Sequence, residues 1–163
     1  MKGVETPGEG PRLASTAVAF RLEGKATPMT PFTPRLRGTS VLLLDDDVDD
    51  LAMLGALLRQ AGADVTPVTT VEDALRALQV RVPHVVVSDL VMRGHDGFTL
   101  VRRLRRMPPG EGGDVPALAI SAFADDEQRE QALAEGFTDY MRKPVHGQIV
   151  EAVMRLAGQP TGA

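Results

Sequence analysis

The sequence of 163 residues predicts an α/β fold, in which a doubly wound, five-stranded parallel sheet carries helices on both faces. From Ser40 onward, short apolar runs alternate with amphipathic stretches of helical spacing, and this alternation repeats five times. Hydrophobic residues make up 43% of the chain and charged residues 25%, a balance typical of a globular domain with a buried core. Together these observations favour one domain built from successive strand–helix units.

The expected strands are short runs of mainly apolar residues, and the first is apolar throughout, as suits a strand buried on both faces. We expect strands at residues 41–44, 63–68, 85–87, 117–121 and 139–142. The expected helices have apolar residues three or four positions apart, at residues 48–61, 71–78, 98–104, 125–135 and 149–156. Asp47 and Thr70 are expected N-caps, and Gly62, Gly136 and Gly158 stand where helices should end.

The first 38 residues differ in composition from the rest of the chain. They hold six basic and three acidic side chains and five of the twelve prolines, with a proline at every third position from 28 to 34. Proline lacks an N–H group and restricts the residue before it, so this composition predicts an extended linker. We therefore expect a flexible, disordered tail at 1–38, a folded domain at 39–158 and a short C-terminal tail at 159–163.

Composition also excludes several classes of function. The chain has no cysteine, which excludes a disulfide scaffold and a thiolate metal site. No apolar run approaches the roughly 18 residues of a membrane span, and the N-terminus lacks the pattern of a signal peptide. The net charge of −4 disfavours direct binding of nucleic acid. We expect a cytoplasmic protein that does not bind membranes, with no DNA-binding domain after its last helix.

Polar side chains stand where the expected strands end. Three aspartates, Asp45, Asp46 and Asp47, follow the first strand, Asp89 follows the third, and Ser121 and Lys143 end the fourth and fifth. Ligands bind at the carboxyl ends of the strands in such sheets, so these residues should meet at one edge. Clustered carboxylates repel one another and need a cation, and oxygen ligands favour Mg²⁺. Lys143 is the only lysine after residue 38 and would supply a compact positive charge.

Five segments in this order resemble the response-regulator receiver domains of two-component (phosphorelay) signalling. The resemblance extends from about residue 40 to 158 and is carried by residues 41–47, 85–89, 92–98, 119–122 and 139–144. It implies a flavodoxin-like (βα)₅ fold. It also implies a bacterial single-domain response regulator that accepts a phosphoryl group from a sensor histidine kinase or a histidine phosphotransfer protein. Such a protein is not an enzyme that turns over a substrate, and it presents a switched surface to a downstream protein target.

The resemblance assigns a role to each residue that matches the family's motifs. Asp89 would be the phospho-acceptor. Asp46 and Asp89 would bind Mg²⁺ directly together with the backbone carbonyl of Val91, and Asp45 would act mainly through a bound water. The run of aspartates leaves the acidic pair open between Asp45/Asp46 and Asp46/Asp47. The strand pattern favours the first pair, which leaves Asp47 as an N-cap.

Three further residues would complete the site by the same resemblance. Lys143 would neutralise charge on the transferring phosphoryl oxygens, and its peptide bond to Pro144 is expected to be cis. Ser121 would donate a hydrogen bond to the phosphoryl group once it is present. Tyr140 would then turn inward as the switch aromatic. Arg93 departs from the family, because proline usually stands at its position, and this predicts a less rigid loop.

Two segments resemble parts of hybrid histidine kinases. Residues 10–22 are similar to the closing strand of a histidine-kinase ATPase domain, and the loop at 107–113 is similar to those of receivers fused to hybrid kinases. This resemblance implies a chain derived from the C-terminal end of a hybrid kinase. The ATP-binding and histidine-bearing segments are absent, so kinase activity is not expected.

Three rival functions remain open on the sequence alone. An aspartate-nucleophile phosphatase usually needs a second aspartate two residues after the nucleophile, where this chain has Val91. A nucleotide-binding domain would need a glycine-rich phosphate loop after a strand, and no such motif occurs. A receiver-like scaffold that binds a partner without phosphorylation is disfavoured by the intact site residues. The arginines at 102, 103, 105 and 106 are interpreted as a solvated helix face rather than a nucleic-acid patch.

Overall fold

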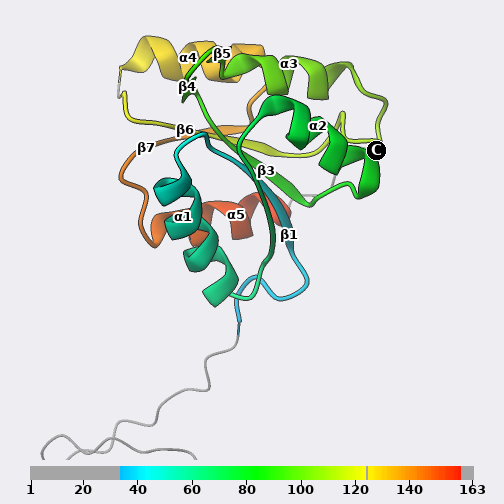
Figure 1. Cartoon of the computed structure of the whole chain (residues 1–163), viewed down its shortest axis with the longest axis vertical. Coiled ribbons are helices and arrows are strands. Elements are labelled where there is room, and N and C mark those ends of the chain that lie inside the picture. Colours follow the sequence, from blue (N-terminus) through cyan, green and yellow to red (C-terminus); the bar gives the residue numbers. More distant parts are fainter. Residues whose placement is uncertain (1–33, 124, 159–163) are drawn as a thin grey trace, which may run out of the picture. The chain divides into compact units, whose positions relative to one another are not determined.

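The computed structural model describes residues 34–123 and 125–158, and Figure 1 shows how their helices and strands are arranged. The predicted tail at 1–38 lies outside the described residues up to residue 33, as does the C-terminal tail at 159–163. The segment at 10–22 that resembles part of a kinase also lies outside them. Within the described residues, no helix has both the length and the apolar character needed to cross a membrane.

Five parallel strands form one sheet, in the order β2-β1-β3-β6-β7. The strands are β1 (Ser40–Leu44), β2 (Asp64–Val68), β3 (Val85–Asp89), β6 (Ala117–Ser121) and β7 (Asp139–Arg142). Leu44 lies opposite Ser88, and Asp89 lies opposite Ile120, so the carboxyl ends of the central strands are level with one another. This register confirms the predicted fold class and brings the residues that follow β1, β3 and β6 to one edge.

The helices cover both faces of the sheet (Figure 1). They are α1 (Val48–Gln60), α2 (Val71–Val80), α3 (Phe98–Arg106), α4 (Asp126–Glu135) and α5 (Gln148–Ala157). Leu43 packs in a cluster with residues of α1 and α5, whereas Leu42 and Leu44 pack in a second cluster with residues of α2, α3 and α4. Each fully buried leucine contributes about 1.5–3 kcal/mol of stability. The alternation along β1 therefore stabilises helices on both sides.

Side-chain caps fix where the helices begin. Asp47 accepts hydrogen bonds from the backbone N–H groups of Asp49 and Asp50, and Thr70 accepts one from Asp73. Both are the caps that the sequence predicts, and they satisfy N–H groups that have no partner inside the helix. Helix α4 ends at Gly136, whose φ of 119° lies in the left-handed region that glycine adopts without strain.

A short antiparallel pair, β4 (Val91–Met92) and β5 (His95–Asp96), follows β3 and was not predicted from the sequence. Gly97 comes directly after this pair. A Cβ atom at Gly97 would lie 2.2 Å from the carbonyl oxygen of Leu90, so the chain can return this close to the end of β3 only with glycine there.

The compact unit begins at Pro34 rather than at the predicted Thr39. Leu36 is only 1% exposed, packs in the cluster of α1 and α5, and donates its backbone N–H to Ala61. Arg35 pairs with Glu151 on α5. These residues belong to the folded domain, because a buried leucine and an ion pair attach them to it. The proline-rich composition does not predict that Leu36 is buried or that Arg35 forms an ion pair with the domain.

The arginine run on α3 is only partly the solvated face that the sequence predicts. Arg103 and Arg106 are exposed. Arg102 pairs with Glu135 and lies over the ring of Phe98. Arg105 donates hydrogen bonds to three backbone carbonyl groups, which belong to Gly113, Val115 and Gly136. Half of the run therefore fastens α3 to its neighbours.

Candidate functional site

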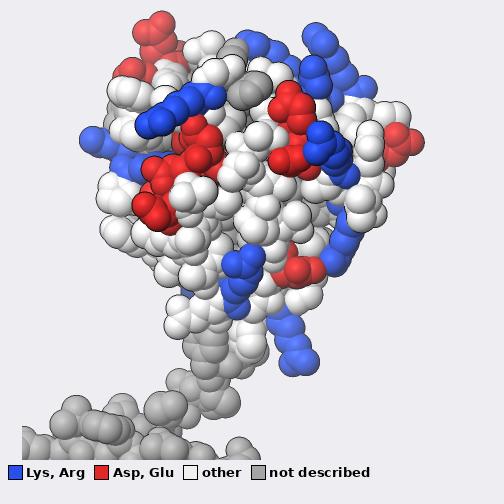
Figure 2. Space-filling view, viewed as in Figure 1, with Lys and Arg blue, Asp and Glu red and all other residues white. Residues whose placement is uncertain are grey.

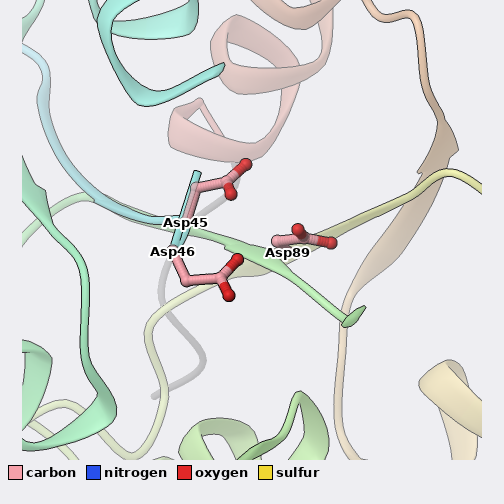
Figure 3. A group of neighbouring side chains, drawn as sticks. All are labelled: Asp45, Asp46 and Asp89. Atoms are coloured by element: carbon pink, nitrogen blue, oxygen red, sulfur yellow. The ribbon is translucent and has the colours of Figure 1, made fainter. Parts of the chain in front are cut away.

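Three aspartates meet at the carboxyl ends of the central strands. Asp45 and Asp46 follow β1, Asp89 ends β3, and Figure 3 shows their side chains facing a common space. One carboxylate oxygen from each lies within 4.8 Å of the others. Asp47 instead caps α1, so Asp45 and Asp46, rather than Asp46 and Asp47, lie beside Asp89.

Burial makes this cluster electrostatically costly. Asp45 is fully buried and Asp89 is 5% exposed, whereas Asp46 is partly exposed. Desolvation raises the pKa of Asp45, and the nearby charge of Asp89 acts in the same sense; hydrogen bonds from Asp47 and Lys143 oppose the shift. Two buried carboxylates side by side need a positive charge in order to stay ionised.

Lys143 supplies positive charge from the end of β7. Its Nζ lies 3.0 Å from Asp45 Oδ2 and 3.3 Å from Asp89 Oδ2, and its side chain is 18% exposed. Burial opposes the charged form, but hydrogen bonds to Asp50 and Asp45 and attraction by Asp89 outweigh it and raise the pKa of Lys143 above its usual value. The Lys143–Pro144 peptide bond is cis, as predicted.

Asp50 is a site residue that the sequence analysis missed. Its Oδ2 lies 2.7 Å from Lys143 Nζ, closer than the oxygens of Asp45 or Asp89. Asp50 stands in the first turn of α1, where acidic residues are common because they suit the helix N-terminus. Its position in the first turn of the helix that follows Asp45 and Asp46 was the available sign that it faces Lys143.

Backbone N–H groups hold each carboxylate in place. Asp47 donates to Asp45 at 2.9 Å, Val91 donates to Asp89 at 3.0 Å, and Arg93 donates to Asp46 at 2.8 Å. Proline could not make the last bond, because it has no N–H group. The backbone N–H of Arg93 therefore attaches the loop to the acidic cluster by a hydrogen bond that the sequence did not predict. The carbonyl of Val91 as a metal ligand stays a prediction.

Ser121 and Tyr140 are joined to each other through a residue that the sequence analysis also missed. The Ser121 hydroxyl donates to Gln128 Oε1 at 2.6 Å, and the Tyr140 hydroxyl lies 3.0 Å from the same oxygen. Gln128 stands three residues after the N-cap of α4, so it faces the end of β6. The backbone also joins the neighbouring strands here, because Lys143 N–H donates to the carbonyl of Ser121 at 2.7 Å.

Acidic side chains gather on the surface where α1 begins, at the left of the face in Figure 2. A cleft of about 290 Å³ lies beside this group and is lined by Asp50, Met53, Leu54, Lys143, Pro144 and Val145. The site therefore opens to the surface next to Lys143.

The donor set fits a hard divalent cation. The clustered ligands are carboxylate oxygens, which Mg²⁺ and Ca²⁺ prefer, and the cluster contains neither sulfur nor imidazole. Among the described residues, Lys143 forms ion pairs with Asp45, Asp50 and Asp89 but not with Asp46, so a second cation would complete the charge balance around Asp46 and Asp89. A buried carboxylate beside an ammonium group and a cation site can act as a nucleophile toward an electrophile that carries negative charge.

Comparison with known sequences identifies the domain. Residues 41–154 match the family described as the response regulator receiver domain. An uncharacterized 14.6 kDa protein from Leptolyngbya boryana is 42% identical over 105 residues, which are 64% of this chain and 79% of that protein. The transcriptional regulatory protein AfsQ1 of Streptomyces coelicolor is 33% identical over 71% of this chain, and the match spans about half of its length (49%).

Solved structures agree with the sequence match. A response regulator from Chloroflexus aurantiacus is 29% identical, with a TM-score of 0.69 over 74% of this chain and 98% of that one. The receiver domain of a sensor histidine kinase from Pseudomonas aeruginosa, described with a magnesium ion coordinated in its active site cleft, is 28% identical with a TM-score of 0.67 over 75% and 99%. The chain therefore belongs to the family of response regulator receiver domains.

Proposed function

We propose that this chain accepts a phosphoryl group on Asp89 and thereby changes the surface that it offers to a protein partner. Receiver domains are signalling domains rather than classical enzymes, and they take part in two-component signalling. The observation that supports the proposal most strongly is the meeting of Asp45, Asp46 and Asp89 within 4.8 Å, with Lys143 Nζ 3.3 Å from Asp89. Each of these groups has a task in phosphoryl transfer.

The proposed reaction is a transfer from the imidazole nitrogen of a phospho-histidine. A carboxylate oxygen of Asp89 forms a bond to phosphorus while the N–P bond breaks, and the imidazole leaves with its electron pair and takes up a proton. Asp89 Oδ1 already accepts the N–H of Val91, so Oδ2, beside Lys143, is the oxygen that we assign as the nucleophile. The deprotonated carboxylate needs no general base.

Lys143 and a bound cation divide the neutralisation of charge between them. Lys143 lies close enough to Asp89 to follow a phosphoryl oxygen once one is attached, provided that it releases Asp45 or Asp50. Asp45, Asp46 and Asp89 would hold Mg²⁺, with the carbonyl of Val91 as a further ligand. When bound, Mg²⁺ supplies positive charge that stabilises the oxygens of the transferring group.

The partners follow from the same proposal. The donor would be a sensor histidine kinase or a histidine phosphotransfer protein, and the receiver of the signal a downstream protein rather than nucleic acid. The chain spans about half of AfsQ1 (49%) and about a quarter of the transcriptional regulatory protein ZraR of Escherichia coli (26%). The transcriptional regulation in the names of those proteins is therefore not assigned to this chain. A cytoplasmic location belongs to the proposal, because a kinase must meet the receiver there.

The test is Mg²⁺-dependent phosphorylation by acetyl phosphate, followed by intact mass. Wild-type protein should gain one phosphoryl group in Mg²⁺ and none in excess chelator. Asp89→Asn should gain none under either condition, because an amide oxygen is a poor nucleophile. Asp64→Asn is the matched control, because Asp64 begins β2 opposite Ser40, at the other edge of the sheet, and it should be phosphorylated as the wild type is.

Two other results would contradict the proposed function. Phosphorylation of Asp89→Asn at the wild-type rate would contradict the choice of acceptor. Mg²⁺ binding without any phosphorylation, by acetyl phosphate or by a phosphorylated histidine phosphotransfer protein, would favour a scaffold that binds its partner constitutively.

A further inference from the structure

Four residues around the end of β6 form a closed ring of hydrogen bonds, which we call the Gln128 ring. The Ser121 hydroxyl donates to Gln128 Oε1 at 2.6 Å, and the Tyr140 hydroxyl lies 3.0 Å from that same oxygen. Tyr140 also donates to the carbonyl of Phe123, and the N–H of Phe123 donates to Ser121 Oγ at 3.2 Å. Gln128 is the only member of the ring that contacts both Ser121 and Tyr140 through its side chain.

The ring connects three elements of the fold. Ser121 ends β6 and follows Ile120, which lies opposite Asp89 in the sheet. Gln128 belongs to the first turn of α4, and its N–H donates to the capping carboxylate of Asp125 at 2.7 Å. Tyr140 lies on β7. A change at Ser121 can therefore reach both α4 and β7 through one carboxamide group.

The ring cannot stay intact if Ser121 donates its hydrogen bond to a new acceptor. A serine hydroxyl can donate one hydrogen bond, and here Gln128 Oε1 accepts it. Ser121 is fully buried, so water cannot replace a lost partner. The Tyr140 hydroxyl also has one proton, which it shares between Phe123 and Gln128. If Gln128 Oε1 loses the hydrogen bond from Ser121, it can accept a stronger hydrogen bond from the Tyr140 hydroxyl.

We propose that Gln128 is the positioning residue that carries the phosphorylation state of Asp89 from Ser121 to Tyr140 and to the first turn of α4. The inference rests on the proposed function, because it requires a phosphoryl group at Asp89. A phosphoryl oxygen is charged and accepts a hydrogen bond about twice as strongly as a neutral carboxamide. The Ser121 proton turns to that oxygen, and the Tyr140 hydroxyl shifts from the carbonyl of Phe123 towards Gln128.

The experiment uses Tyr140 as its own probe, because the chain has one tyrosine and no tryptophan. Tyrosine emission is recorded before and after phosphorylation by acetyl phosphate and Mg²⁺, and phosphoryl incorporation is measured by intact mass on the same samples. Gln128→Met keeps the length of the side chain and removes both hydrogen bonds. Gln131→Met is the matched control, because Gln131 is exposed on the same helix.

In the wild type and in Gln131→Met, we expect a change in emission that follows the phosphoryl group stoichiometrically. In Gln128→Met, the change per phosphoryl group should fall by more than half. Gln128→Glu keeps an acceptor oxygen and should restore the emission change.

Three outcomes would overturn the inference. One is a Gln128→Met protein whose emission responds to each phosphoryl group as the wild type does. Another is an equal loss of response in Gln131→Met, which would show a general effect of α4. The third is a wild-type protein that is phosphorylated without any change in Tyr140 emission. A wild type that takes up no phosphoryl group would instead overturn the proposed function.

Discussion

Lys143 determines the balance of charge at the acidic cluster. Three carboxylates, those of Asp45, Asp50 and Asp89, lie within 3.3 Å of its Nζ, and the side chain is mostly buried. Arginine could not replace it simply, because a planar guanidinium needs more room than an ammonium group. A bound divalent cation would supply positive charge to the same carboxylates, so it would compensate in part for the loss of Lys143.

Replacing Lys143 with methionine should lower the free energy of unfolding by about 1–3 kcal/mol in chelator, because it leaves buried carboxylates without their cation. Adding Mg²⁺ should stabilise this variant more than the wild type, since the metal then has no competing ammonium group. Urea unfolding with and without Mg²⁺ measures both effects. Arg76→Met, which removes an exposed ion pair, is the control. Equal behaviour of the two variants would contradict this charge balance.

The raised pKa of Asp45 predicts the pH dependence of metal binding. Burial makes the carboxyl group keep its proton to a higher pH than an ordinary aspartate, whose pKa is about 3.9. Mg²⁺ has to displace that proton, so affinity should fall and proton release should increase as the pH is lowered from neutrality towards this range. Calorimetric titration of Mg²⁺ in buffers of different ionisation enthalpy measures both quantities. Constant affinity from neutrality down to about pH 5, as aspartates of ordinary pKa would give, would refute the shift.

At the scale of the elements, the sequence analysis succeeded where burial and capping decide the structure. The five strands of the sheet and the caps Asp47 and Thr70 were predicted, because apolar runs and capping side chains act locally. The pair β4 and β5 was missed because two residues per strand give no periodicity. Asp50 and Gln128 were missed because the rotation of a helix relative to a site at the sheet edge depends on packing between distant segments.

Arg105 provides a test of how α3 is fastened. Its guanidinium donates to the carbonyl groups of Gly113, Val115 and Gly136, and burial lowers its pKa. Arg105→Met should therefore lower the free energy of unfolding by about 2–4 kcal/mol, because three partly buried carbonyl groups lose a charged donor. Arg103→Met, at an exposed position of the same helix, should cost less than about 0.5 kcal/mol. Thermal or urea unfolding measures the difference, and equal costs would support the solvated-face interpretation.

For the whole molecule, the folded domain includes the residues just before β1. Leu36 is buried against α1 and α5, and Arg35 pairs with Glu151, so the chain enters the domain at Pro34. Composition placed this boundary at residue 39, because proline and basic residues continue up to Arg37. A single buried leucine in a proline-rich segment has no periodic partner and is not recognised from the sequence.

Leu36→Ala in the full chain should lower the free energy of unfolding by about 2–5 kcal/mol, the usual cost of a cavity in a core. Leu133→Ala is the matched control, because Leu133 is 37% exposed on α4, and it should cost much less. Urea unfolding of both variants gives the comparison. If Leu36→Ala cost no more than the control, the domain would begin at residue 39 as the composition predicts.

The central claim, that Asp89 is the phospho-acceptor, is tested most directly by locating the phosphoryl group. Protein phosphorylated by acetyl phosphate and Mg²⁺ is treated with borohydride, which reduces an acyl phosphate to an alcohol and so converts the acceptor aspartate to homoserine. Peptide mass spectrometry then identifies the position. We predict homoserine at Asp89 alone, with Asp45, Asp46 and Asp50 unchanged. Homoserine at any of those three positions, with Asp89 intact, would contradict the account.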